Sequence, residues 1–440
     1  MTRIDQAADL HGRLEHGHQL EAAGQVLQAE LIYVGVLKRW PSSIDAVMRL
    51  ARLALRRGDS TRAVQLLQAA ARTNPTNPQL GVDLAVALAN AERLPEAITT
   101  IEATLSNTPS HCAAWLLLGQ LREASGDSSG ALKAVYQAVT RAQRAGQWKD
   151  METTPPEIFD EVVAAIERVR RGRRELFLGA YDELRQQHGA LALARVDRAV
   201  TGYLNDWDSR PTDPRQRPKF FFFPDLPNTP YQDPYLHPWA KRLTLAFPLI
   251  RADALRVLEE DRRLPNFIPD TARVEDYVSG EGVAPSWEAF FFYRHGKRFD
   301  ANHRRCPETS AVLESIELCR IADQAPEILF SVLKPGSHIN AHHGVTNVRL
   351  VMHLPLVGPR DCALNLVDHG EHPWKEGQLV MFDDTYLHEA WNRSDATRIV
   401  LLMDCWNPHL TEVERHAVQQ LLETISGLHV ADRTPKRAAK

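Results

Sequence analysis

The chain has 440 residues, more than one ordinary domain requires, so we expect two or three domains. Hydrophobic residues make up 44% and charged residues 25% of the sequence, which is typical of a soluble globular protein, and the net charge of -4 gives no electrostatic support for binding nucleic acid. No apolar run reaches the roughly 18 residues of a membrane span, and residues 1–30 lack the continuous apolar core of a secretory signal.

A repeat with a period of 34 residues fills the first third of the sequence. Proline, alanine and a turn glycine each recur at this spacing, and Glu92 takes the place of glycine in one unit. A proline at the start of a helix pair and a turn residue midway are typical of a helix-turn-helix unit. The residues that keep the period are Pro41, Pro75 and Pro109, then Ala29, Ala63, Ala97 and Ala131, and finally Gly24, Gly58 and Gly126.

This pattern resembles the tetratricopeptide repeat. The positions that match that repeat are Pro109, Trp115, Leu118, Gly119 and Ala131. We therefore expect an all-α solenoid over residues 7–142, in four units of which the first is degenerate. The concave face of such a solenoid usually binds a peptide, so a peptide or protein partner is expected. The alternative is a rigid spacer or a dimerisation arm.

A helical connector is predicted for residues 157–208. Apolar residues at helical spacing predict a first helix from Ile158 to Val169, and a second is expected from Leu191 to Leu204. We interpret the basic run from Arg168 to Arg174 as a solvated helix face, because glutamates flank it. The proline- and arginine-rich segment Ser209–Pro218 is expected to be a linker.

Residues 219–425 show a pattern of short strands separated by turn residues, which predicts an antiparallel barrel or jelly roll. A strand at residues 219–223 and a helix over His237–Leu258 are expected before it. The whole chain is thus predicted to be an α+β multidomain protein. The predicted strands are Glu288–Tyr293, Glu327–Leu333, Asn347–Leu354, Ala363–Val367, Gln378–Phe382, His388–Asn392 and Arg398–Cys405.

One predicted strand carries an unusual face. Between Val348 and Leu354, alternate positions hold Arg349, Val351 and His353, while the other face is apolar. This polar face is either solvated, as in many antiparallel sheets, or directed into a site inside the jelly roll. The sequence alone leaves both possibilities open.

Two histidines in separate strands, His342 and His388, are followed by Arg398 ten positions after the second. This spacing suits an iron centre that also binds a dicarboxylate co-substrate, since neutral imidazoles are good ligands for ferrous iron. Gly344 stands where the usual His-x-Asp/Glu pattern has a carboxylate. The histidines could equally be ordinary core or surface residues, and His343 is an alternative to its neighbour.

The cysteines provide no competing metal site. The chain has five of them, scattered without a CxxC spacing, so neither a disulfide framework nor a zinc knuckle is expected. A reducing, cytoplasmic setting is the simplest interpretation.

Longer motifs carry a resemblance to a known family. The strings FSVLKPGSHINAHHGVTNVRLVMHLPL, EGQLVMFDDTYLHEAWN and TRIVLLMDCWNP resemble the aspartyl/asparaginyl β-hydroxylase family, as do WEAFFFYRHGKRFDANHRRCPET and FFFPDLP upstream. The similarity covers about residues 220–408. It implies an oxygenase on a double-stranded β-helix that depends on Fe(II), 2-oxoglutarate and O2. Animal members of the family also carry tetratricopeptide repeats before the oxygenase domain.

The resemblance also implies roles for individual residues. His342 and His388 would bind iron, and Arg398 would pair with the distal carboxylate of 2-oxoglutarate, a bidentate match that suits a guanidinium. Ser331 would add a hydrogen bond to that carboxylate. His353 would contact the carboxylate nearest the metal.

The residues expected to bind the substrate depart from the family pattern at one position. Arg349 would bind the acidic side chain of an aspartate substrate, giving a β-hydroxylated Asp or Asn in a peptide. Family members often have a second basic residue two positions later, where this chain has Val351. This departure leaves open the same chemistry on a lipid acyl chain or a free amino acid. A non-catalytic scaffold with a decayed oxygenase site is a further alternative.

The remaining polar and aromatic residues have local interpretations. Asp383 and Asp384 are expected to close a turn and to orient His388 through hydrogen bonds, the alternative being a metal-binding carboxylate pair. Three further side chains either line the substrate entrance or have structural roles: Tyr293, Arg294 and Arg298. Core positions are expected for Trp391 and Trp406.

Overall fold

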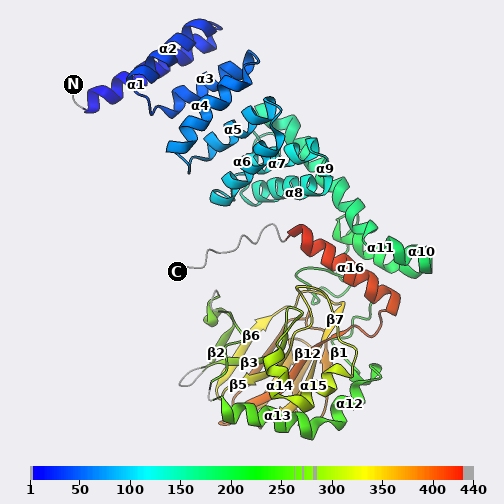
Figure 1. Ribbon diagram of the computed structural model, residues 1–440. Coiled ribbons are helices and arrows are strands. Elements are labelled where there is room, and N and C mark those ends of the chain that lie inside the picture. Colours follow the sequence, from blue (N-terminus) through cyan, green and yellow to red (C-terminus); the bar gives the residue numbers. More distant parts are fainter. Residues whose placement is uncertain (1–2, 262, 270–271, 281–284, 430–440) are drawn as a thin grey trace. The chain divides into compact units, whose positions relative to one another are not determined.

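The computed structural model describes residues 3–261, 263–269, 272–280 and 285–429 (Figure 1). The chain divides into two compact units, Met1–Arg173 with Leu428–Lys440, and Arg174–Gly427. Among the described residues, the first unit contains helices and no strands, whereas the second is built around two sheets. Among the described helices, none is both long and apolar enough to cross a bilayer.

The first unit contains four antiparallel helix pairs that follow one another along the chain (Figure 1). Each pair corresponds to one predicted repeat, so the all-helical solenoid is confirmed. The helices are α1 (Arg3–Ala22), α2 (Val26–Arg39), α3 (Ile44–Arg56), α4 (Ser60–Thr73), α5 (Pro78–Asn90), α6 (Leu94–Asn107), α7 (Cys112–Ala124) and α8 (Ser128–Arg144).

The residues that keep the period share one environment in every repeat. The four periodic alanines are all 0% exposed at helix contacts, where a larger side chain would hold the helices apart. The turn glycines all have a positive φ, between 74° and 84°, which the missing Cβ permits. Glu92 adopts the same left-handed conformation, with φ 60°, although it has a Cβ. The backbone therefore keeps the repeat turn even where glycine is absent.

The helical connector leads from the first unit into the second. It consists of η1 (Pro156–Ile158), α9 (Phe159–Gly179), α10 (Asp182–His188), η2 (Ala190–Leu193) and α11 (Ala194–Tyr203). The second predicted helix is therefore shorter than expected, since its first turn is a 3-10 turn. The prediction of a solvated face holds for Arg170, Arg171 and Arg174, which are exposed. Arg173 is half-buried instead, with its guanidinium 6.0 Å from the ring centroid of Tyr136.

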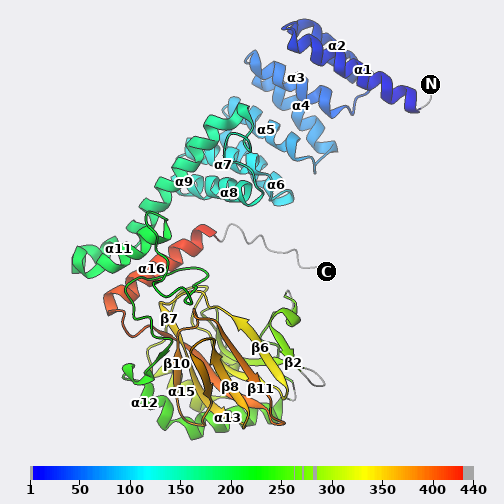
Figure 2. The same ribbon diagram turned by 180° about the vertical axis from the view of Figure 1, so that it is seen from behind.

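The second unit is built on two antiparallel sheets. In the part of the chain that the structure describes, the large sheet has the order β1-β10-β7-β12-β5-β3-β4 and the small sheet the order β2-β6-β11-β8-β9. The chain passes back and forth between them from β5 to β12, which is the arrangement of a jelly roll. Figure 2 shows β6, β11 and β8 of the small sheet side by side. The predicted fold class is confirmed.

Seven strands agree closely with the predicted ranges, whose ends shift by no more than three residues, but β1, β2, β4, β6 and β9 lie outside those ranges. The strands are β1 (Tyr231–Gln232), β2 (Val278–Gly280), β3 (Trp287–Arg294), β4 (Lys297–Arg298), β5 (Ile328–Leu333), β6 (Ser337–His342), β7 (Arg349–Val357), β8 (Cys362–Leu366), β9 (Gly370–Pro373), β10 (Val380–Phe382), β11 (His388–Asn392) and β12 (Arg398–Trp406).

Two expectations upstream of the sheets were wrong in detail. The helix predicted over His237–Leu258 is two helices, α12 (Ala240–Leu245) and α13 (Phe247–Glu260). Pro248 is the reason, because a proline inside a continuous helix lacks the N–H that the preceding turn needs. The strand expected at residues 219–223 is reduced to one bridge, between Phe221 and Thr346.

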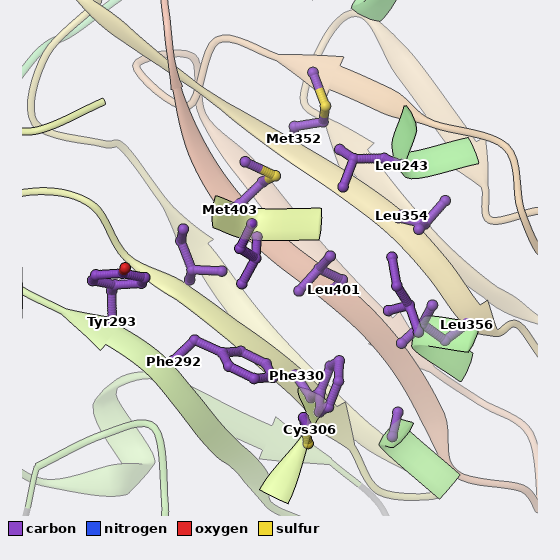
Figure 3. Close-up of a cluster of buried hydrophobic side chains, with 14 of the residues drawn as sticks. Leu243, Phe292, Tyr293, Cys306, Phe330, Met352, Leu354, Leu356, Leu401 and Met403 are labelled. Carbon is purple, nitrogen blue, oxygen red and sulfur yellow. The ribbon is translucent and has the colours of Figure 1, made fainter. Parts of the chain in front are cut away.

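Helices cover one face of the large sheet, and the small sheet faces the other. The helix-side core joins residues of α12, α13 and α15 (Pro307–Glu314) to alternate residues of the central strands, and Figure 3 shows Leu243 of α12 beside Met352 and Leu354 of β7. Short helices complete this unit: η3 (Pro234–Leu236), η4 (Val274–Asp276) and α14 (Asp300–Arg305). The last helix, α16 (Glu412–His429), follows β12. The opposite face of β7, with Arg349, Val351 and His353, is therefore directed between the sheets.

The exceptional turn at Glu92 gives a first prediction. Glu92→Gly removes the Cβ from a left-handed turn, so we expect a gain in stability of about 0.5–1 kcal/mol. Urea unfolding followed by far-UV circular dichroism measures it. Gly58→Ala is the matched control, because an added Cβ there meets nothing within 4 Å and only the positive φ opposes it; it should cost a similar amount. A lower urea midpoint for Glu92→Gly than for the wild type would contradict the claim that the Cβ of Glu92 destabilises this turn.

Candidate functional site: a histidine pair beside a buried arginine

The histidine pair is held by two neighbouring strands. His342 ends β6 and His388 begins β11, and the two residues are direct partners in the antiparallel register. Their ring centroids are 4.2 Å apart. The structure therefore brings together the two histidines that the sequence placed in separate strands, because residues opposite each other in a sheet project from the same face.

Each ring of the pair is oriented by its own backbone. His342 Nδ1 donates to the carbonyl of Asn340 at 2.8 Å, and His388 Nδ1 donates to the carbonyl of Tyr386 at 3.0 Å. A carbonyl only accepts, so each Nδ1 carries the proton and each Nε2 keeps its lone pair. Both rings are thus in the tautomer that a metal ligand requires.

Burial keeps both imidazoles neutral. It lowers the pKa of His388 to about 3, with the neighbouring His342 adding to the effect. Burial also lowers the pKa of His342, partly offset by the bond to Asn340. A neutral imidazole is the form that coordinates ferrous iron, so no proton has to leave before a metal binds near neutral pH.

The polar residues near the histidine pair form hydrogen bonds elsewhere. His343 Nδ1 bonds to the carbonyl of Thr385 at 2.8 Å, and His338 pairs with Glu389 at 2.9 Å. Asp383 closes the turn as predicted, since its carboxylate accepts from the backbone N–H of Thr385 at 2.9 Å. The expectation that these aspartates orient His388 was wrong: its Nδ1 bonds to a backbone carbonyl instead.

Gly344 is packed against a carboxyl group from a distant part of the chain. A Cβ added at Gly344 would lie 2.1–2.2 Å from the carboxyl atoms of Asp384. The side chain of Asp384 thus occupies the space that a carboxylate at position 344 would need. Over the described ranges, no group of three His, Cys, Asp or Glu side chains is arranged to hold a metal ion.

A cavity of about 410 Å³ between the sheets contains the predicted site residues. Strands of both sheets contribute side chains to it, and two of these, Ser331 of β5 and Arg398 of β12, lie 67 positions apart in the sequence. The predicted residues that line it are Ser331, His342, Arg349, His353, His388 and Arg398. Trp287 and Trp374 also form part of its wall.

Arg398 is a buried cation at one end of this cavity. Its side chain is 1% exposed, and Nη1 donates to the carbonyl and to Oγ of Ser331 at 3.2 and 3.1 Å. Its Nε is buried without a hydrogen-bond partner, and its guanidinium lies 4.6 Å from the ring centroid of Trp374. Burial lowers the pKa of Arg398 to about 10. A guanidinium buried this way is ready to receive an anionic group.

Ser331 and His353 present hydrogen-bonding atoms to the same space. Ser331 Oγ accepts from Trp287 Nε1 at 2.9 Å as well as from Arg398, so its own proton remains to donate. Both ring nitrogens of His353 are buried and have no partner. Burial, followed by the charge of Arg398, lowers the pKa of His353 well below its usual value. These atoms fit a carboxylate-bearing ligand held by Arg398.

Arg349 has a partner that the sequence analysis missed. Its Nη1 forms an ion pair with Oδ1 of Asp404, which is 1% exposed. Glu327 and Asp384 lie near the pair, and burial, with Asp404 adding to it for both, raises the pKa of each carboxyl to about 7. Alternation along β12 is the signal that could have placed Asp404 on the inward face, because it shares that face with Arg398, but alternation does not identify Arg349 as its partner.

The three side chains considered for the substrate entrance lie in different environments. Arg294 lines the cavity, and its Nη2 donates to the carbonyl of Phe267 at 3.0 Å. Tyr293 is 3% exposed within the helix-side core, and Arg298 forms ion pairs on the surface, so the structural alternative fits these two residues better. The tryptophans expected in the core are buried: Trp391 and Trp406 are each 5% exposed.

Comparison with known proteins agrees with this geometry. A family profile described as aspartyl/asparaginyl β-hydroxylase matches residues 245–408, and tetratricopeptide-repeat profiles match residues 14–78 and 54–121. The chain belongs to the aspartyl/asparaginyl β-hydroxylase family, and its first unit consists of tetratricopeptide repeats.

Three named relatives illustrate the similarity. Aspartate β-hydroxylase domain-containing protein 2 of Mus musculus is 33% identical over 54% of this chain and 67% of that protein. The ornithine lipid ester-linked acyl 2-hydroxylase of Rhizobium tropici is 35% identical over 42% of this chain and 62% of that protein. The aspartyl/asparaginyl β-hydroxylase of Homo sapiens is 30% identical over 40% of this chain and 22% of that protein. The match thus spans less than two thirds of the Rhizobium and human relatives.

The contact between Gly344 and Asp384 gives a second prediction. Gly344→Ala inserts a methyl group into occupied space, so we expect a loss of about 1–3 kcal/mol in urea unfolding. Adding Asp384→Ala should recover most of the lost free energy of unfolding, because it removes the side chain that the new methyl group meets, and the effects of substitutions at contacting residues are not additive. Gly427→Ala, in α16, is the control, since nothing lies within 4 Å of its added Cβ. Strict additivity in the double variant would show that the two residues do not compete for space.

Proposed function

We propose that the second unit is an Fe(II)- and 2-oxoglutarate-dependent hydroxylase. One observation supports this above all: a neutral imidazole pair, with both Nε2 atoms available, lines the same cavity as the buried Arg398. The first group suits a ferrous ion, and the second suits the distal carboxylate of the keto acid. The family membership supports the same chemistry.

The residues have distinct tasks in this proposal. Bound iron, with 2-oxoglutarate and O2, would supply the oxidising power that no protein side chain has. His342 and His388 would hold the metal through Nε2, leaving the other coordination positions open. Arg398 and Ser331 would hold and orient the dicarboxylate, and His353 would donate or accept at its second carboxylate. Ser331, His353 and Arg398 are all buried, and the low dielectric around buried groups strengthens each of these contacts.

The family description supports an Asp or Asn residue of a peptide or protein as the substrate, hydroxylated at its β-carbon. The repeats are suited to recruit such a partner. The relative from Rhizobium tropici, named for an acyl chain, supports the alternative of a lipid substrate. The Arg349–Asp404 pair favours this second candidate over an aspartate, because the guanidinium that would bind an acid already has a counter-ion.

The setting of the protein is also a proposal. All five cysteines are free, which agrees with the reducing cytoplasm expected from the sequence. A decayed, non-catalytic scaffold is the competing interpretation of the whole chain. Release of succinate from 2-oxoglutarate, dependent on added Fe(II), distinguishes the two, since a scaffold produces none.

Removal of one ligand gives a third prediction. His388→Ala leaves one imidazole for the metal, so we expect Fe(II) binding, measured by anaerobic equilibrium dialysis, to fall below detection. His343→Ala is the matched control. The ring of His343 bonds to the backbone carbonyl of Thr385, so its removal should leave the affinity for Fe(II) unchanged. Equal loss in both variants would contradict the assignment of the pair.

The buried guanidinium gives a fourth prediction. Arg398→Met keeps the volume but removes the charge, so the affinity for 2-oxoglutarate should fall about 10- to 100-fold, the value of a charged hydrogen bond. The melting temperature of the metal-free protein should stay equal or rise, because an uncompensated buried charge is costly. Arg393→Met, at an exposed position nearby, should change neither quantity. A lower melting temperature with unchanged 2-oxoglutarate affinity would make Arg398 structural.

A further inference from the structure

At the Arg349 end of the cavity, the positive charge of Arg349 is already paired with a carboxylate of the protein. Asp404 forms the ion pair with Arg349, and its other oxygen accepts from the backbone N–H of Glu327 at 2.8 Å. Both partners are enclosed: the side chain of Arg349 is 14% exposed and that of Asp404 is 1% exposed. The next inward residue of β7 is Val351, which adds no second cation. An acidic substrate group would therefore have to displace Asp404 from Arg349.

Two further carboxyl groups face this end with free oxygens. Glu327 Oε1 accepts from the backbone N–H of His295 at 3.0 Å and also lies 3.0 Å from the ring Nδ1 of His295, while Oε2 of Glu327 is buried without a hydrogen-bond partner. Asp384 is 8% exposed, and its Oδ1 is likewise buried without a partner. Both residues line the cavity. The cavity thus offers unused acceptors beside an ion pair that is already complete.

The neighbouring polar side chains leave Oε2 of Glu327 and Oδ1 of Asp384 without a hydrogen-bond partner. Arg294, also in the wall, directs Nη2 at the carbonyl of Phe267, and its guanidinium lies 4.5 Å from the ring centroid of Phe291. Glu389, a fourth carboxylate in the wall, is different: its two oxygens bond to His338 and Asn365, at 2.9 and 2.8 Å. The excess of acceptors is therefore local to Glu327 and Asp384.

We propose that this end of the cavity is a subsite for a cationic group of the substrate, an ammonium or a guanidinium. Such a group carries donors only, so it would satisfy the free oxygens of Glu327 and Asp384 and compensate carboxylates that are costly to bury alone. The inference rests on the proposed function, because it takes the cavity to be the substrate site. The oxidised carbon would then lie between this cation and the histidine pair.

The rest of the wall fits the remainder of such a substrate. Apolar side chains surround the space between the charged groups, and they suit an aliphatic segment rather than a second polar group. These residues are Phe267, Ile268, Ala272, Ile339, Val351 and Leu402. The substrate class is therefore an aliphatic chain that ends in, or lies beside, a cationic nitrogen.

A binding experiment on the full chain, without iron or 2-oxoglutarate, tests this directly. The probes are n-butylguanidinium and n-butylurea, which have nearly the same shape but differ in charge, titrated by ligand-observed NMR. We expect the wild type to bind the guanidinium at least about tenfold more tightly than the urea, as a charged hydrogen bond does relative to a neutral one. Equal affinity, or no binding of the guanidinium, would overturn the proposal.

Matched variants locate the effect. Glu327→Gln and Asp384→Asn should each reduce the preference for the guanidinium by about tenfold, whereas Glu389→Gln, whose carboxylate has partners, should keep it. Circular dichroism confirms that each variant is folded. A preference that survives both Glu327→Gln and Asp384→Asn would place the cation elsewhere. Since no turnover is measured, failure here is distinct from failure of the hydroxylase assignment, which the succinate assay decides separately.

Discussion

The antiparallel pairing of β6 with β11 is the constraint on which the site depends. It places His342 directly opposite His388, in the wall of a cavity that strands of both sheets line. Backbone carbonyls two residues earlier fix each ring, so the orientation of the pair requires no further side chain. A shift of one residue in this register would turn one imidazole to the other face of the sheet. The cavity and its chemistry thus follow from a few hydrogen bonds between two strands.

The site is expensive for the fold that contains it. Arg398 and His353 are buried with unpartnered nitrogens, and Glu327 and Asp384 keep unpartnered oxygens. Such groups lower stability unless a ligand satisfies them. The large sheet offsets this cost on its other face, where a continuous apolar core joins β7 and β12 to the covering helices (Figure 3). Stability and ligand binding are thereby assigned to opposite faces of the same strands.

Much of this arrangement could be predicted from the sequence, because it follows from periodicity. The alanines and turn residues defined the repeats, and alternation in β7 defined a polar face without deciding its direction. The Arg349–Asp404 pair could not be found in this way, since the two residues lie 55 positions apart and only the strand order brings them together. The contact of Gly344 with Asp384 is hidden for the same reason. Local patterns specify elements, whereas pairings between them depend on register.

X-ray absorption of the Fe(II)-loaded full chain in the presence of 2-oxoglutarate measures the central claim most directly. We expect two imidazole ligands to iron, with oxygen atoms in the remaining positions. A spectrum with one imidazole or none, or with a third protein nitrogen, would contradict the assignment of His342 and His388 as the metal-binding pair.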